Sequence, residues 1–127
     1  MEMEEQIKDL AQNLVATLSE MLGVNLKYDR ASVEWMDGYI ERVRPTLDKS
    51  SVDGLANSIG SFLGECIIAT HGGTWREADG TWGVYFDEEN AAYPFAKAQK
   101  HLLNGSEDSI LSFFDMIPIV FSNSYDI

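Results

Sequence analysis

The sequence predicts an α+β protein in which four or five helices pack on a small antiparallel β-hairpin or three-stranded sheet. Apolar residues recur with helical spacing in segments at both ends of the chain. Between them, an Asp-Gly dipeptide separates two short aromatic segments, which is a strong hairpin signal. The chain of 127 residues fits one domain, residues 1–127, and can bury a core without disulfides or metals.

The first segment has the apolar stripe of an amphipathic helix, with polar residues on the opposite face. Gly23 is expected to end this helix, since glycine readily adopts the left-handed conformation found there. Residues 24–28 alternate well enough for a short strand or an extended connector. The stripe consists of Ile7, Leu10, Ala11, Leu14, Val15, Leu18, Met21 and Leu22.

Asp29 is a candidate N-cap for a second helix that continues to about Arg44. Pro45 should end it, because proline disfavours helical geometry in the residue before it. A third helix is expected after Ser50, whose hydroxyl would form a capping-box-like pair with Asp53.

Two glycines in the third predicted helix, Gly60 and Gly64, lie one turn apart. Each disfavours the helix by about 1 kcal/mol relative to alanine. Two such residues on one face indicate that another element packs very close there.

The hairpin is predicted from 74–78 and 81–86, which flank Asp79-Gly80. Aspartate and glycine tolerate the positive φ angles of a type I′ turn. One face of the hairpin would be rich in aromatic residues and must pack on the helices or on a partner, because an isolated hairpin is marginal in water. The predicted cross-strand pairs are Ala78 with Thr81, Glu77 with Trp82, and Trp75 with Val84.

The rest of the chain is predicted to form a short third strand at 91–93 and two further helices. Pro94 suits the first turn of the fourth helix. Ser106 is the candidate N-cap of the last helix, and Pro118 is expected to end it. The residues expected to point inward from the fourth helix are Phe95, Ala98, Leu102 and Leu103.

The charge balance limits the classes of partner. Nine Lys and Arg face twenty-one Asp and Glu, giving a net charge of −12. Binding to nucleic acid or to anionic membrane surfaces is disfavoured, because both depend on Lys and Arg. Such a surface attracts a basic protein, although acidity also simply maintains solubility. With no membrane-length apolar run and an acidic N-terminus unlike a secretory signal, the expected location is cytoplasmic.

No catalytic residue, metal site or cofactor is predicted. Cys66 and His71 lie around one helix end and His101 is remote, so they do not have metal-ligand spacing. Cys66 stands among apolar neighbours, which should keep its thiol protonated and inert. No nucleophile elbow or phosphate-binding loop occurs.

Glu65 is the one acid within an otherwise apolar helix end. It is expected to reach Arg76 or Arg42 in a structural ion pair. The alternative is a small-molecule-binding or enzymatic domain with a pocket near Glu65, Arg76 and Trp75, in which Glu65 has a raised pKa.

Several motifs follow one another along the chain: the segments 33–35 and 40–42, a Gly-x-x-x-Gly-Glu helix (59–68), a Gly-Gly-x-Trp hairpin (72–75), a Tyr-Pro-Phe-Ala-Lys helix (93–97) and the segment 104–110. In these motifs much of the chain resembles a widespread, poorly characterised family of small acidic bacterial proteins. The resemblance implies no established activity, and in general character the family is similar to immunity proteins of bacterial toxin systems.

The leading hypothesis is therefore an acidic protein-binding module, most concretely an immunity or inhibitor protein that neutralises a basic toxin or nuclease. The hairpin and the acidic loop after it are its predicted binding surface, although the tryptophans also fit a role in the core. A further option is a homo-oligomer that associates through the apolar segment 117–121. The candidate binding residues are Glu77, Asp79, Trp82, Asp87, Glu88 and Glu89.

Overall fold

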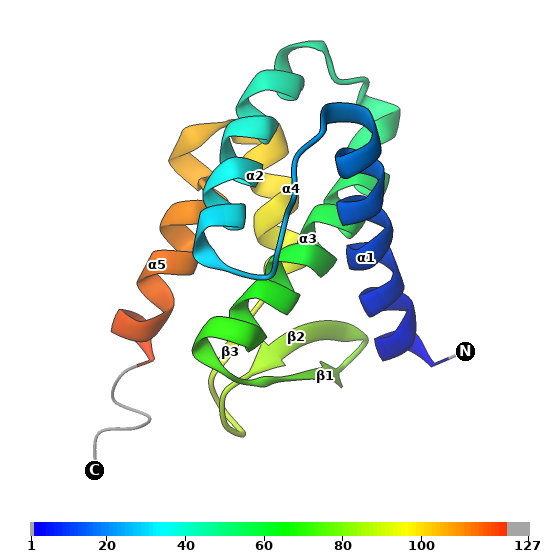
Figure 1. Ribbon diagram of the computed structural model, residues 1–127. Helices are drawn as coiled ribbons and strands as arrows, with labels where there is room; N and C mark the ends of the chain where they lie inside the picture. The colour runs from blue at the N-terminus through cyan, green and yellow to red at the C-terminus, as the bar shows by residue number, and fades with distance from the viewer. Residues whose placement is uncertain (1, 122–127) are drawn as a thin grey trace.

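The structure, a computed structural model, describes residues 2–121 and confirms the α+β fold class for them (Figure 1). Five α-helices and a three-stranded antiparallel sheet of order β1-β2-β3 make up this part of the chain. Two 3₁₀ turns, Arg44–Thr46 and Ser106–Asp108, precede α3 and α5. The elements are α1 Met3–Leu22, α2 Arg30–Val43, α3 Lys49–His71, β1 Thr74–Ala78, β2 Thr81–Tyr85, β3 Ala91–Ala92, α4 Pro94–Asn104 and α5 Ile110–Val120.

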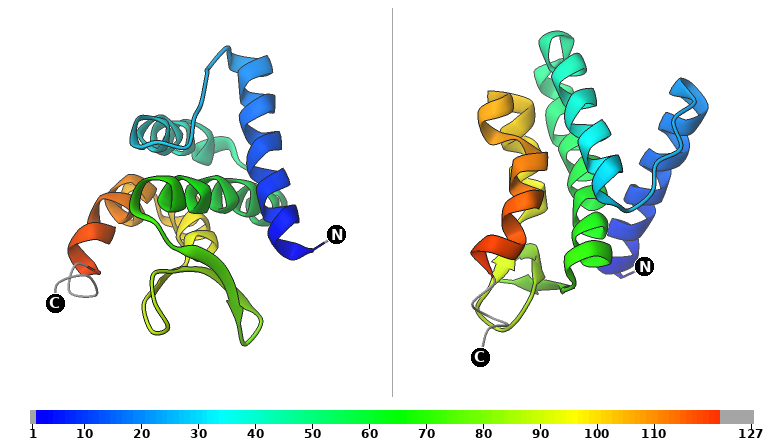
Figure 2. Two further views of the ribbon diagram at one scale, coloured as in Figure 1. Left: turned by 60° about the horizontal axis from the view of Figure 1, so that its bottom comes forward. Right: turned by 60° about the vertical axis from the view of Figure 1, so that its left-hand side comes forward.

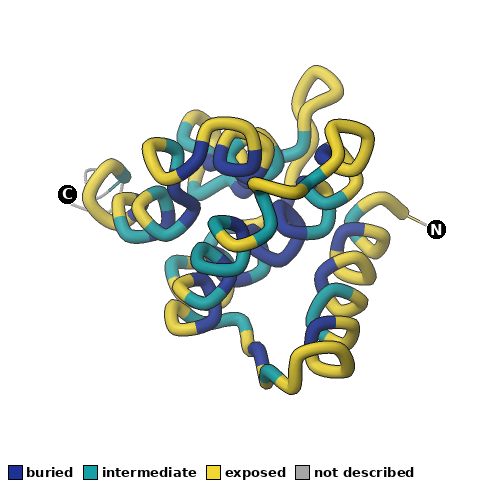
Figure 3. Tube along the Cα trace, turned by 90° about the horizontal axis from the view of Figure 1, so that it is seen from above, coloured by how far each residue is buried: buried dark blue, intermediate teal, exposed yellow. Residues whose placement is uncertain are grey.

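The long helix α3 is the centre of the molecule, and α1 and α4 pack along it (Figures 1 and 2). The sheet lies at the C-terminal end of α3, where the N-terminal end of α1 and the C-terminal end of α5 also lie. We call this region the sheet end. Buried residues gather where the helices face one another, and exposed residues follow the outer surfaces and loops (Figure 3).

The first two helix boundaries agree with the sequence predictions. Gly23 has a φ of 69° and its N–H bonds to the Ser19 carbonyl, so α1 ends in the left-handed conformation that glycine favours. The side chain of Asp29 accepts a hydrogen bond of 2.9 Å from the Ser32 N–H, as expected of an N-cap. Residues 24–28 form the connector and not a strand.

The predicted cap of the third helix is wrong. The helix begins at Lys49, one residue before Ser50, and no side chain caps its first turn. Asp53 instead accepts a hydrogen bond of 3.0 Å from the Gln99 side chain of α4. Asp53, which the sequence pattern assigned to a helix cap, therefore links α3 to α4 instead.

The last helix also differs from its predicted bounds. Ser106 opens the 3₁₀ turn, and the N-cap of α5 is Ser109, whose hydroxyl accepts from the Ser112 N–H at 3.2 Å. Pro118 lies inside α5 and does not end it. Proline lacks an N–H, which leaves the Phe114 carbonyl without its helical donor. The His71 ring of α3 packs against the Phe114 ring at this point, with the ring centroids 4.6 Å apart.

The two glycines of α3 mark close packing, as predicted. A Cβ at Gly60 would lie 2.8 Å from the Phe95 Cα of α4. A Cβ at Gly64 would lie 2.1 Å from the Trp75 ring, so the indole of β1 rests directly on the α3 backbone. The sheet is thus fixed to α3 through Trp75, which is only 7% exposed.

The predicted hairpin register is confirmed for all three pairs. Asp79 and Gly80 have φ angles of 53° and 79°, which fit the primed turn. The third strand is shorter than 91–93, because Tyr93 precedes α4 as its N-cap residue. No helix within residues 2–121 has both the length and the apolar character needed to cross a bilayer.

Candidate functional site

Glu65 does not pair with Arg76 or Arg42. Its Oε2 accepts a hydrogen bond of 2.8 Å from the Trp75 indole, so the acid orients the ring that covers Gly64. Arg76 lies over the Tyr85 ring, and Arg42 lies over Trp35. Because neighbouring strand residues point to opposite faces, Trp75 and Arg76 cannot line one pocket together.

Cys66 is fully buried between α3 and the connector after α1. Burial raises the pKa of its thiol, which disfavours the reactive thiolate. Within residues 2–121, no three His, Cys, Asp or Glu side chains come together as metal ligands.

A partly buried polar cluster that the sequence analysis missed joins α2, α4 and the start of α5. Periodicity placed Leu103 inward on α4, but Leu103 is 53% exposed and His101 is fully buried in its place. His101 Nδ1 accepts from the Ile110 N–H at 3.1 Å, and Nε2 lies 2.7 Å from Glu41 Oε2. Asp37 accepts from the Leu111 N–H at 3.0 Å and from the Ser109 hydroxyl. We call Asp37, Glu41, His101 and Ser109 the α5 cap.

The α5 cap is organised for structure and not for nucleophilic catalysis. The first N–H groups of a helix have no partner within that helix, and here the cap provides acceptors for three of them. His101 Nδ1 is occupied by a backbone N–H, so it cannot serve as a base for Ser109. The ring is also closed to solvent, which leaves no path for a substrate.

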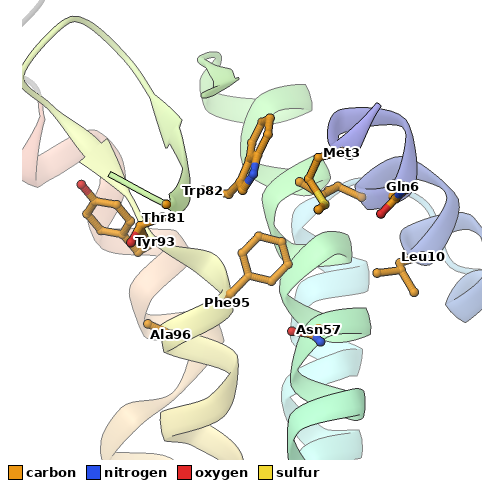
Figure 4. Close-up of a pocket in the computed structure, with 11 residues that line it drawn as sticks. Met3, Gln6, Leu10, Asn57, Thr81, Trp82, Tyr93, Phe95 and Ala96 are labelled. Atoms are coloured by element: carbon orange, nitrogen blue, oxygen red, sulfur yellow. The ribbon is translucent and has the colours of Figure 1, made fainter. Parts of the chain in front are cut away.

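The first of two surface clefts lies between the N-terminal half of α1 and the sheet (Figure 4). It has a volume of about 500 Å³ and is mostly apolar. Trp82 and Phe95 stand on one side of it, and Met3, Gln6 and Leu10 project toward it from α1. Leu10 belongs to the predicted buried stripe, yet it is partly exposed because it borders this opening. We call this the α1 cleft.

The border of the α1 cleft is acidic. Asp79 precedes the lining residue Gly80, and Glu2 precedes the lining residue Met3. Both carboxylate residues are exposed, and no Lys or Arg lines the cleft. The nearby Lys8 is paired with Glu4 at 3.3 Å, so it does not offset the other acids.

The second cleft lies between α4, β3 and the C-terminal half of α5, and has a volume of about 580 Å³. We call it the α5 cleft. Thr81, Tyr93 and Ala96 line both clefts and therefore separate them. Unlike the α1 cleft, it has lysines, Lys97 and Lys100, in its lining. Neither cleft includes Glu65, Arg76 or Trp75, the residues of the alternative pocket hypothesis.

The predicted binding residues fall at two ends of the sheet. Glu77, Asp79 and Trp82 lie near the β1–β2 turn, beside the α1 cleft. The loop that holds Asp87, Glu88 and Glu89 follows the far end of β2, a strand that spans roughly 17 Å at about 3.4 Å per residue. The six residues therefore do not form one continuous patch around the turn.

Asp87 also has a local role. Its Oδ1 accepts hydrogen bonds of 2.8 Å from the Glu89 and Asn90 N–H groups, and its Oδ2 accepts from the Asn90 side chain. An aspartate that bonds to the backbone two and three residues ahead shapes a turn. Glu88 and Glu89 are exposed on that loop.

Comparisons with protein families, characterised proteins and solved structures found no match for this chain. The resemblance to a family of small acidic bacterial proteins therefore stays a prediction. The residues that sequence reasoning missed are Met3, Leu10, Tyr93 and Phe95, which line the α1 cleft with Trp82. Apolar periodicity assigns such residues to the core, and only the position of α1 relative to the sheet shows which of them border an opening.

Proposed function

We propose that this protein is a protein-binding module for a basic partner, most concretely an immunity or inhibitor protein that neutralises a basic toxin or nuclease. The observation that carries the proposal is the α1 cleft, where an aromatic and aliphatic lining has an acidic border. A net charge of −12 speeds the encounter with a cationic protein. The cleft then offers a place where apolar side chains of the partner can be buried.

Trp82 is the expected anchor of the interaction. It is partly exposed in the cleft beside Phe95, and tryptophan is among the residues that contribute most at protein interfaces. An indole face also attracts the Lys and Arg side chains that a basic partner brings. Glu77 and Asp79 lie on the same side of the sheet end and would contribute to the attraction.

The predicted set of binding residues divides accordingly. We assign Glu77, Asp79 and Trp82 to the contact surface. Glu88 and Glu89 would contribute only to the negative electrostatic field of the whole protein. The small-molecule alternative near Glu65, Arg76 and Trp75 is less favoured, because the Trp75 ring fills the space against α3.

The test begins with capture of partners from the native cell lysate on the immobilised protein at low salt, followed by titration with the purified captured protein. Binding should weaken steeply with added salt, because salt screens the attraction between exposed charges. Trp82→Ala should weaken binding at least about tenfold. If the partner is a toxin or nuclease, wild-type protein should inhibit it and Trp82→Ala should inhibit it less.

Two charge variants form a matched pair. Asp79→Asn and Glu89→Gln each remove one negative charge, and asparagine tolerates the positive φ of position 79. Only Asp79→Asn should slow association markedly. If the two variants slowed association equally, or if the affinity did not change with salt, contact at the α1 cleft would be contradicted.

A further inference from the structure

The outward face of α5 is an apolar stripe in a strongly acidic protein. Met116 and Val120 are both more than half exposed, and with Ser112 they lie four residues apart, on one side of the helix. The helix contains a single charged residue, Asp115. Both Asp115 carboxylate oxygens bond to Arg30 of α2, at 2.8 and 2.7 Å, so this charge is already paired.

The α5 cleft lies directly beside this stripe. Met116 and Val120 form part of its wall, together with Phe113 and Tyr93. Ile117, which the sequence analysis included in an associating tail, is buried in the core and is not available on this face. One helix thus provides both an exposed apolar ridge and the wall of a neighbouring groove.

The charges around the α5 cleft are balanced. Lys97 pairs with Asp108 at 3.2 Å. Lys100 and Glu107 also line the cleft, and together they add no net charge. This neutrality contrasts with the −12 of the whole chain and with the acidic border of the α1 cleft.

We propose that the α5 face and the α5 cleft form the contact between two copies of this chain. A two-fold symmetric contact requires one patch that is complementary to itself, and an apolar ridge beside an apolar groove meets this requirement. Two molecules that each carry −12 repel one another over most of their surfaces. They can approach most easily where local charges cancel and apolar area is exposed.

This contact should respond to salt in the opposite direction from binding of a basic partner. Added salt screens the repulsion between two acidic copies, and it leaves burial of the apolar ridge largely unaffected. Self-association of the full chain should therefore strengthen as salt rises. The inference does not depend on the proposed partner, because it concerns the protein by itself.

The experiment is sedimentation velocity on the full chain over a range of protein concentrations, at low and high salt. The test variant is Met116→Glu, which places a carboxylate on the ridge. Its matched control is Leu22→Glu at the end of α1, since Leu22 is 53% exposed and Met116 is 52% exposed. Both variants add one negative charge, and circular dichroism would verify that both are folded.

We expect wild type and Leu22→Glu to dimerise, and the fraction of dimer should rise with salt and with protein concentration. Met116→Glu should be monomeric under the same conditions, with at least about a tenfold loss of affinity, as a buried charge without a partner is strongly disfavoured. A wild-type protein that stays monomeric throughout, or a dimer that salt dissociates, would overturn the proposal. So would a dimer that Leu22→Glu disrupts as strongly as Met116→Glu.

Discussion

The two ends of the helical layer differ in which side chains are enclosed by the fold and which are exposed to solvent. At the end where α5 begins, polar side chains are hydrogen-bonded around the first turn of that helix. His101 is fully buried there, and Asp37 and Glu41 are partly buried beside it. At the sheet end, apolar side chains stand open on the surface, among them Trp82, Tyr93 and Met116. Each end thus departs from a simple pattern of apolar core and polar surface.

The difference separates structure from binding. Buried polar groups are tolerated where every one of them has a partner, and the α5 cap meets that condition, so it fixes α5 against α2 and α4. Exposed apolar groups gain nothing from the fold, which makes them the candidates for contact with another molecule. Variants of the α5 cap should therefore change stability, and variants of the exposed apolar side chains at the sheet end should change binding.

The largest effect is expected from Gly64→Ala, which tests how firmly the sheet end is attached. The new Cβ would lie 2.1 Å from the Trp75 ring and force the indole from α3 and from Glu65. We expect a loss of about 3 kcal/mol in the free energy of unfolding, at the upper end for overpacking. Urea denaturation measures it. Gly54→Ala, where nothing lies within 4 Å, should instead be neutral or stabilising.

Asp37→Ala tests the α5 cap. It removes the acceptor of the Leu111 N–H and of the Ser109 hydroxyl, so two partly buried donors lose their partner. The expected loss is about 2 kcal/mol in the free energy of unfolding, with binding of a basic partner unchanged. Asp53→Ala, which removes an exposed hydrogen bond to Gln99, should stay within about 0.5 kcal/mol. Equal losses for the two variants would show that burial of the cap contributes little.

Asp29→Ala provides a solvent-facing counterpart to Asp37. Loss of this N-cap should lower the free energy of unfolding by about 1 kcal/mol near neutral pH. Hydrogen bonds from Ser32 lower the pKa of Asp29 below 3.8, so the carboxylate stabilises the fold above that pH. The difference between wild type and variant should shrink as the pH falls below 3.8. A difference that stays constant into acid would argue against a charged cap.

The smallest effect is expected from His71, at the sheet end of α3. Burial lowers the pKa of His71 below 6.5, and the nearby Phe114 backbone only partly opposes this shift. As pH falls below 6.5, the unfolded chain binds the proton first, so stability decreases until the folded protein also binds it. His71→Gln should flatten the dependence of the unfolding free energy on pH in that window. Thermal melts across the window compare the two slopes.

Local signals explain why most of the fold could be predicted. The Asp-Gly turn requires positive φ angles that few residues tolerate, and it specifies the register of β1 and β2 by itself. Gly60 and Gly64 disfavour the helical conformation of α3, so their presence on one face indicates that another element packs closely there. Local signals do not fix every helix end, since Ser50 and Ser106 have the local features of caps but neither is one.

The site could be predicted only in part. Trp82 was placed on the aromatic face of the hairpin from its register, and it does line a cleft. Its neighbours across the cleft come from α1, more than seventy residues earlier in the chain, and no short-range pattern links the two. The same holds for Glu65, whose partner is the indole of Trp75 and not an arginine.

Four features follow from the amino-acid sequence without any structure: the α+β class, the hairpin register, the capping of α2 by Asp29 and the surplus of acid. These features depend on backbone preferences within a few residues, or on composition alone. Three others became visible only with the packing of the helices: His101 is buried, Pro118 is accommodated inside α5, and two apolar clefts flank Tyr93. Each of these depends on how far-separated helices pack, because that packing determines which polar groups find partners and which apolar groups stay exposed.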